Sequence, residues 1–220
     1  MSLKILYEDN HLLVVFKPAG LLIQGDKSGR PTLLEIARKY LKDKYKKPGQ
    51  VYLGLVHRLD RAVAGVVIFA RTSKAAGRLS REFRERRVKK IYRAVVEGLP
   101  PPAATLKNIL LRDRKKGRSR IFKEMVPGGQ QVELSYHLIK KTKNRALLEI
   151  IPETGRHHQI RAQLGALGYP IVGDISYGAK TKLPDGNISL FCRQISFLHP
   201  VTKKELTIQA PLPTDFLSRN

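Results

Sequence analysis

The sequence predicts an α+β fold in which helices pack against a mixed, largely antiparallel sheet. Segments that suit strands outnumber segments with helical spacing, and most neighbouring strand candidates are separated by short turns rather than by a helical crossover. The 220 residues are enough to bury a substantial core. We therefore expect one domain over residues 1–220, without internal repeats or low-complexity tracts.

Ten segments have the composition and alternation of strands. They are residues 4–7, 12–16, 63–69, 89–97, 106–111, 121–122, 132–139, 145–151, 188–198 and 205–208. The run 63–69 is apolar throughout, which indicates a strand that is buried on both faces. A turn at His199 and Pro200 joins the last two segments.

Three helices are expected. Thr32 followed three residues later by Glu35 is a capping-box pattern at the start of the first helix. Thr72 caps the second, which carries basic residues on the face opposite its apolar stripe. The third, His158 to Leu167, is closed by Gly168. Three of its residues are expected to face the core: Ile160, Leu164 and Leu167.

A basic segment, Arg112 to Arg120, separates two strand candidates. It holds six basic residues, one acid and one glycine. We expect a hairpin with a mobile basic finger at its tip that contacts RNA. A solvated loop that touches nothing is the alternative. The candidate contacts in the finger are Arg114, Lys115, Lys116 and Arg118.

The chain as a whole is strongly basic. Its 42 Lys and Arg residues against 18 Asp and Glu give a formal net charge of +24, while 42% of the residues are hydrophobic. This combination predicts a folded body with a basic surface, whose usual partner is a polyanion such as nucleic acid. Basic residues that serve only solubility are the alternative.

Membrane and metal-dependent classes are disfavoured. No apolar run approaches the ~20 residues of a spanning helix, and the amino terminus lacks the pattern of a signal peptide. Cys192 is the only cysteine, so neither an intramolecular disulfide nor a zinc ribbon can form, and a cytoplasmic location is expected. Adjacent His157 and His158 would point to different sides of a helix start, and no metal site is expected.

The tetrad His57-Arg58-Leu59-Asp60 is an unusual start for a buried strand, because an ionised carboxylate is costly to bury unless it is paired. Some positive group must therefore compensate Asp60. The strand that follows would hold Asp60 rigidly at the start of the strand. A fixed position favours a reactive group. We expect His57 to support this loop through a hydrogen bond.

Five motifs, in this order, resemble the RluA-type pseudouridine synthase family. They are Lys17-Pro18-Ala19-Gly20, the tetrad ending in Asp60, Lys90-Ile91-Tyr92-Arg93 running to Glu97-Gly98, Gly155 to Arg161, and Gly173-Asp174 with Tyr177-Gly178. The resemblance extends from about residue 5 to the final strand. The chain departs from the family pattern at Val63-Ala64, where the family usually has Thr-Ser or similar, and at His157, where it often has Thr.

The resemblance implies an isomerase with the pseudouridine synthase fold. The reaction breaks the bond from ribose to the ring nitrogen, turns the uracil and rejoins it through carbon 5, so no cofactor is required. In the family the tetrad ends on the catalytic aspartate, here Asp60, which acts as a nucleophile or removes a ribose proton. The resemblance also pairs Arg161 with Asp60. Tyr92 is expected against the target uracil, with an ordinary strand tyrosine as the alternative.

Further RNA contacts are expected around these three residues. Arg58 is expected to brace the space that a flipped-out nucleotide vacates, the alternative being a surface arginine that pairs with an acid. The other candidates are His57, Arg156 and the four finger residues. We expect the sequence to begin directly in the catalytic region, without a separate RNA-binding domain, so that its own basic surfaces bind a tRNA or ribosomal RNA. No obligatory protein partner is evident.

Two functions stay open on the sequence. The first is an RNA pseudouridine synthase, and the second is a non-catalytic RNA-binding or ribosome-assembly protein that keeps the fold. Asp60, Tyr92 and Arg161 favour the enzyme, because a pure binding protein has no reason to keep a carboxylate where an RNA phosphate approaches.

Overall fold

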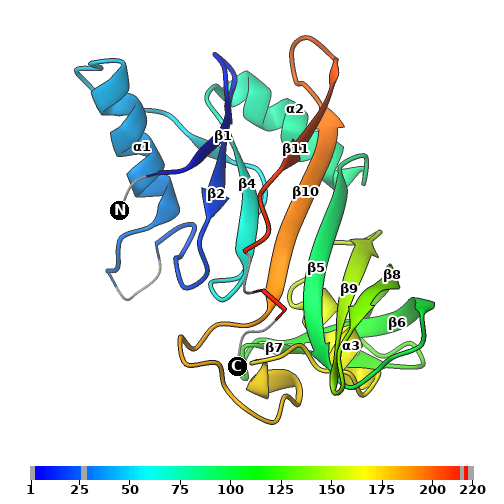
Figure 1. The fold of residues 1–220 in the computed structure, drawn as a ribbon. Helices are drawn as coiled ribbons and strands as arrows, with labels where there is room; N and C mark the ends of the chain where they lie inside the picture. The colour runs from blue at the N-terminus through cyan, green and yellow to red at the C-terminus, as the bar shows by residue number, and fades with distance from the viewer. Residues whose placement is uncertain (1–2, 26–28, 214–215, 218–220) are drawn as a thin grey trace. The chain divides into compact units, whose positions relative to one another are not determined.

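The computed structural model describes residues 3–25, 29–213 and 216–217, which fall into two compact units (Figure 1). Unit 1 comprises Met1–Lys89 and Cys192–Pro211, and unit 2 comprises Lys90–Phe191 and Leu212–Asn220. The single catalytic domain over residues 1–220 stays a prediction.

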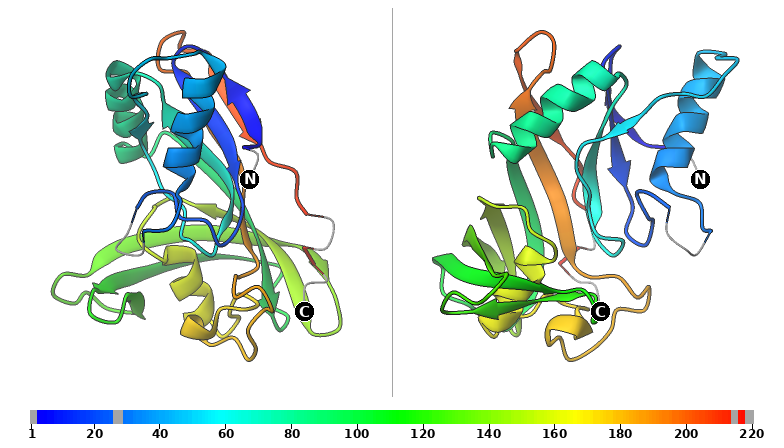
Figure 2. Two further views of the ribbon diagram at one scale, coloured as in Figure 1. Left: turned by 90° about the vertical axis from the view of Figure 1, so that its left-hand side faces the viewer. Right: turned by 180° about the vertical axis from the view of Figure 1, so that it is seen from behind.

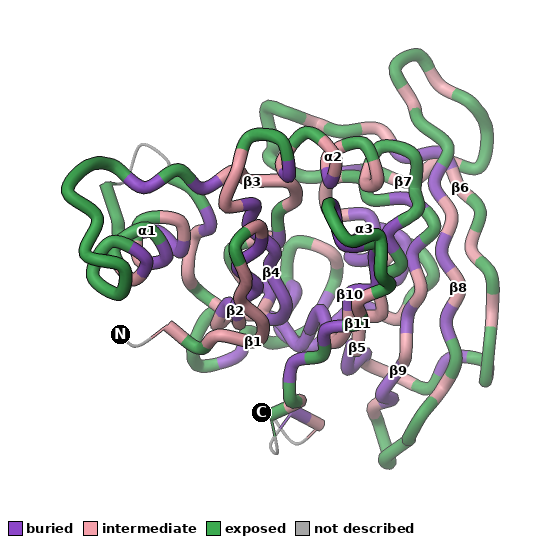
Figure 3. The backbone as a smooth tube through the Cα atoms, turned by 90° about the horizontal axis from the view of Figure 1, so that it is seen from above, coloured by how far each residue is buried: buried purple, intermediate pink, exposed green. Residues whose placement is uncertain are grey.

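The main strands of unit 1 run in the order β1 (Ile5–Glu8), β2 (Leu12–Lys17), β4 (Ala64–Ala70) and β10 (Leu190–Leu198), of which β10 belongs to this unit from Cys192 onward. The short strand β3 (Gly54–Leu55) pairs with β4, and β11 (Glu205–Gln209) pairs with β10. In β4 every residue after Ala64 is buried, which confirms the strand buried on both faces (Figure 3).

The two helices of unit 1 begin where the sequence predicted. In α1 (Leu33–Lys44), the Thr32 hydroxyl accepts a hydrogen bond from the Glu35 amide, and the Glu35 carboxylate accepts one from the Thr32 amide. In α2 (Ser73–Arg84), the Thr72 hydroxyl caps the Ala75 amide. Both helices lie on the same side of the strands of unit 1 (Figure 2, left).

Unit 2 is an antiparallel array with one covering helix. Its strands run in the order β5 (Lys89–Glu97), β9 (Arg145–Pro152), β8 (Gln130–Lys141), β6 (Ala103–Asp113) and β7 (Arg118–Phe122). The helix α3 (Gln159–Ala166) is followed by the 3-10 turn η1 (Ile175–Tyr177).

The basic finger is shorter than the sequence predicted. The β6–β7 ladder continues through the pairs Arg112 with Ser119 and Asp113 with Arg118. Only residues 114–117 remain as the tip, and the positive φ of Gly117 lets the chain turn there.

The prediction that Leu167 faces the core is wrong, since its side chain is 37% exposed. Leu167 is the last residue before Gly168, which turns the chain away from α3 at a φ of +90°. The Gly168 and Tyr169 amides then bond the Gly165 and Leu164 carbonyls. Ile160 and Leu164 are buried as expected.

Candidate active site and RNA-binding surface

Asp60 lies in a tight turn of unit 1, four residues before β4. The Val63 amide donates to the Asp60 carbonyl at 3.0 Å, and the Gly20 amide donates to the Arg61 carbonyl at 2.8 Å. Leu59 is buried, whereas Asp60 is only partly buried. The first two family motifs therefore meet here, and the Asp60 side chain stands on a backbone fixed from both sides.

Lys17, at the end of β2, is the cation beneath this turn. Its side chain is fully buried, and its Nζ donates to the carbonyls of Pro18 (3.0 Å), Arg61 (3.0 Å) and Val63 (2.6 Å). Burial lowers the pKa of Lys17 to about 7, against the opposing effect of the nearby Asp60 carboxylate. The three ammonium donors thus reach backbone carbonyls and hold the turn.

His57 supports the same region as expected. Its Nε2 accepts a hydrogen bond from the Ile68 amide in β4 at 3.0 Å, and its ring stacks on Phe83 with centroids 4.9 Å apart. Arg58 next to it is exposed. Its role on the RNA side stays a prediction.

Gly65 is the glycine that follows the tetrad, and the approach of β10 requires it. A Cβ atom built at Gly65 would lie 2.3 Å from the Cys192 carbonyl oxygen, and its φ is +132°. Residues with side chains rarely adopt this conformation. Cys192 itself is fully buried, so packing is its evident role.

In unit 2, Arg161 is a buried cation with a carboxylate partner. Its Nε and Nη2 donate to the two oxygens of Asp174 at 2.7 and 2.9 Å, a bidentate pair in which Asp174 is 2% exposed. The guanidinium also lies 5.0 Å from the centre of the Tyr177 ring. Asp174 was not predicted from the sequence as a partner of Arg161.

His158 connects Arg161 to Tyr177. Arg161 Nη1 lies 2.8 Å from His158 Nε2, and His158 Nδ1 lies 3.0 Å from the Tyr177 hydroxyl. Because a guanidinium can only donate, Nε2 accepts, and the neutral ring then carries its proton on Nδ1 toward Tyr177. His158 adopts a left-handed backbone at the start of α3, with a φ of 54°.

The close packing of α3 on η1 depends on Gly165. A Cβ atom there would lie 2.5 Å from the Tyr177 carbonyl oxygen. This approach brings Asp174 and Tyr177, which come from the fifth family motif, against Arg161 of the fourth.

The start of α3 is tied down by Gln159. The buried Gln159 side chain accepts hydrogen bonds from the Thr154 hydroxyl and the Arg156 amide and donates to the Glu133 carbonyl in β8. Arg156 is exposed at this bend. It can therefore meet a ligand without rearrangement.

Tyr92 lies on β5 opposite Ile150 of β9, so it belongs to the row that also contains the buried Ala94. Lys90 shares this face, and its Nζ is 3.2 Å from the position of a Cβ at Gly155. The motif that contains Tyr92 and the motif that ends on Arg161 are thus neighbours within unit 2.

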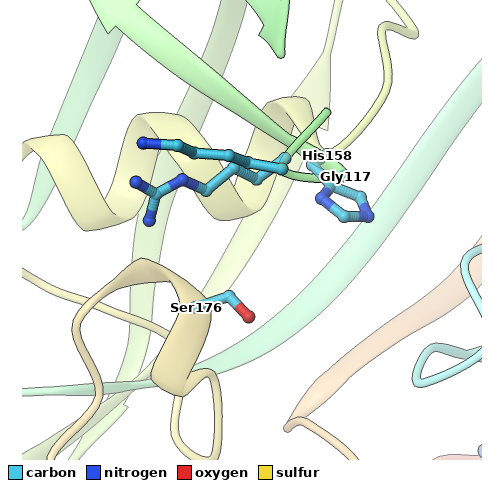
Figure 4. A pocket seen from close by; sticks show the side chains of 5 residues that line it. Gly117, His158 and Ser176 are labelled. Carbon is cyan, nitrogen blue, oxygen red and sulfur yellow. The ribbon is translucent and has the colours of Figure 1, made fainter. Parts of the chain in front are cut away.

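A cavity of about 450 Å³ opens at the tip of the β6–β7 hairpin (Figure 4). Its lining residues are Lys116, Gly117, Arg118, His158 and Ser176. Arg114 and Lys115 are exposed on the same tip and are not lining residues. Two of the four predicted finger contacts are therefore brought together with α3 and η1.

The predicted catalytic residues are divided between the units. Asp60 belongs to unit 1, whereas Tyr92 and Arg161 belong to unit 2. The pairing of Asp60 with Arg161 stays a prediction. Sequence reasoning missed Lys17, Asp174 and Tyr177 as supporting residues, although all three stand in family motifs.

In the described part of the chain, no helix has the length and apolarity needed to cross a membrane, and no three His, Cys, Asp or Glu side chains are grouped as metal ligands.

Comparison with known proteins gives a consistent set of relatives. The family model for RNA pseudouridylate synthase matches residues 11–166. Ribosomal large subunit pseudouridine synthase C of Buchnera aphidicola subsp. Baizongia pistaciae is 35% identical over 216 residues, which cover 94% of this chain and 66% of that protein. Dual-specificity RNA pseudouridine synthase RluA of Haemophilus influenzae is 33% identical over 210 residues, covering 94% of this chain and 92% of that protein.

Among solved structures, human RNA Pseudouridylate Synthase Domain Containing 4 superimposes with a TM-score of 0.81 at 26% identity. The match covers 97% of this chain and 90% of the human one. This chain spans about two thirds of the length of the Buchnera protein and nearly all of the Haemophilus protein.

Proposed function

The chain belongs to the RNA pseudouridylate synthase family, whose members are isomerases that convert uridine to pseudouridine, and on that premise we propose that Asp60 catalyses this reaction on tRNA or ribosomal RNA. The RluA-type family and the α+β fold class that the sequence predicted are confirmed by the same relatives. The catalytic residues and the RNA target are our proposal.

The observation that supports the proposal is the rigid backbone turn on which Asp60 lies. Lys17 holds the carbonyls of Arg61 and Val63, directly after the aspartate, so the turn is fixed while Lys17 donates to backbone rather than to the carboxylate. A carboxylate that stays partly exposed on a rigid turn suits a group that must meet a substrate.

The reaction balances without a cofactor. The bond between ribose carbon 1 and ring nitrogen 1 breaks, the uracil turns, and carbon 5 bonds to the ribose while losing its proton; nitrogen 1 gains a proton. Asp60 acts as a carboxylate, either by attacking as a nucleophile or by removing a ribose proton. Tyr92 stacks on the base as it turns, and Arg161 is the proposed positively charged partner of Asp60.

The replacement Asp60→Ala should abolish isomerisation and leave RNA affinity nearly intact, because it removes the reacting carboxylate and one negative charge. Release of tritium from RNA labelled at uridine carbon 5 measures the reaction, and filter binding measures affinity. Asp60→Asn, which keeps the side-chain shape, is the control for folding. Pseudouridine formed at the same site by either variant would refute the catalytic assignment, and a wild-type protein that binds but never isomerises would be a non-catalytic RNA-binding protein.

The target is found by mapping pseudouridines in total RNA from cells with and without the gene. Positions that lose the modification identify tRNA or ribosomal RNA as the substrate. The cytoplasm is the compartment that we propose, since the RNA substrate is there and the chain has a single cysteine.

A further inference from the structure

The cavity at the hairpin tip of unit 2 is lined by side chains that are suited to an anion. Lys116 supplies a compact ammonium, Arg118 a guanidinium fork and Ser176 a hydroxyl, and none of the five lining residues is acidic. In Figure 4, Ser176 on η1 lies across from Gly117 and His158. The cations thus belong to a hollow between three elements instead of an isolated loop.

The hairpin is anchored where it meets this hollow. The amide of the buried Ser119, next to Arg118, donates to the Tyr177 hydroxyl at 2.8 Å, and its hydroxyl donates to the His157 carbonyl at 2.7 Å. At the tip, the Lys116 amide donates to the Asp113 carboxylate at 2.9 Å. Both lining cations are therefore carried on backbone whose position is fixed before a ligand arrives, which lowers the entropic cost of binding.

His158 forms one wall of the cavity and also contacts Arg161. Since both of its ring nitrogens already face protein partners, Arg161 and Tyr177, the ring shapes the cavity while Lys116, Arg118 and Ser176 are available to meet an anion. An anion held here is separated from Arg161 by a single side chain.

We propose that this cavity binds a backbone phosphate of the RNA substrate, and the proposal rests on the RNA-directed function given above. A phosphodiester presents the oxygens that an ammonium, a guanidinium and a hydroxyl recognise, and such contacts set the register of a nucleic acid without reading its sequence. The volume of about 450 Å³ exceeds one phosphate and leaves room for the attached sugars. The cavity therefore positions the RNA relative to α3 and Arg161.

A comparison of two double variants tests the cavity. Lys116→Gln with Arg118→Gln removes two charges that line it, and Arg114→Gln with Lys115→Gln removes two charges from the same tip outside it. With a short synthetic RNA stem-loop as the probe, we expect the first pair to lower affinity about tenfold and the salt-dependence slope by about 1 to 2, and the second pair to lower affinity less than about threefold.

A second comparison adds a charge instead of removing one. Ser176→Glu sets a carboxylate inside the cavity, whereas Ile175→Glu adds the same charge to the neighbouring residue, whose side chain is exposed. The first should weaken stem-loop binding about tenfold, and the second should have a much smaller effect. In turnover assays the cavity variants should raise KM and leave kcat nearly unchanged, because a phosphate contact is equally strong before and in the transition state.

Equal losses for the two double variants, together with equal losses for the two glutamate variants, would overturn the cavity proposal even if the wild-type protein isomerises uridine. Conversely, the cavity variants could lose RNA affinity more than their controls while the wild-type protein never forms pseudouridine. That result would refute the proposed function and support the phosphate site.

Discussion

Among the residues that the structure describes, each unit buries one Lys or Arg side chain, and the two are held in different ways. In unit 1, Lys17 donates to three neutral backbone carbonyls, whereas in unit 2 Arg161 forms a bidentate ion pair with Asp174. Neutral acceptors satisfy hydrogen bonds without cancelling the charge, so burial lowers the pKa of Lys17 to about 7.

The difference follows from the shapes of the two side chains. An ammonium has three diverging donors that fit converging carbonyls, and a guanidinium is a planar fork that fits a carboxylate and stays protonated. The Lys17 ammonium that supports the Asp60 turn therefore titrates near neutral pH. Breaking each support in turn should show this difference.

The largest effect is expected from Asp174→Ala. It removes the Asp174 carboxylate, which accepts two hydrogen bonds from the buried Arg161 guanidinium, and this should lower the free energy of unfolding by about 3–5 kcal/mol. Urea unfolding measures the change. The double variant Arg161→Met with Asp174→Leu removes both charges and should recover most of the stability, but it should not isomerise uridine. A stable Asp174→Ala protein would show that the pair is not essential for folding.

Lys17→Met should have the next largest effect. Three backbone carbonyls lose their donor, at a cost of about 1–3 kcal/mol that is partly offset because an ammonium no longer has to be buried. The loosened turn should lower isomerisation about 10- to 100-fold and change RNA affinity little. Lost RNA binding with unchanged turnover of bound substrate would contradict this role for Lys17.

The free energy of unfolding should depend on pH through Lys17. Between about pH 7 and 10.5 the unfolded chain keeps the Lys17 proton and the folded chain releases it, so this residue makes the free energy of unfolding rise with pH in that range. The slope from one such group is at most ~1.4 kcal/mol per pH unit. Urea unfolding across this range should show that Lys17→Met reduces the slope; an unchanged slope would mean that Lys17 keeps its proton in the fold.

The smallest effect is expected from Tyr177→Phe. It removes the acceptor of the Ser119 amide and the partner of His158, at a cost of about 1–2 kcal/mol, and should speed hydrogen exchange at Ser119. Tyr136→Phe in the same unit is the matched control, because the buried Tyr136 hydroxyl has no hydrogen-bond partner among the described residues. Equal destabilisation by the two variants would rule out a specific anchor at Tyr177.

Local sequence patterns determined much of this protein. The capping residues Thr32 and Thr72, the apolar run of β4 and the strand of Tyr92 depend on neighbours in the chain, so their signals can be read without a structure. The ordered motifs, with Asp60 in the second, likewise identified the family.

Only the tertiary structure decided which groups support the site. The Lys17 ammonium meets a carbonyl 46 residues away, Arg161 meets a carboxylate 13 residues away, and Tyr177 accepts from an amide 58 residues away. Such pairs depend on strand register and on close approaches such as that at Gly165, which no local pattern encodes. The exposed Leu167 has the same cause, since a helical period gives the direction of a side chain but not where the packing partner ends.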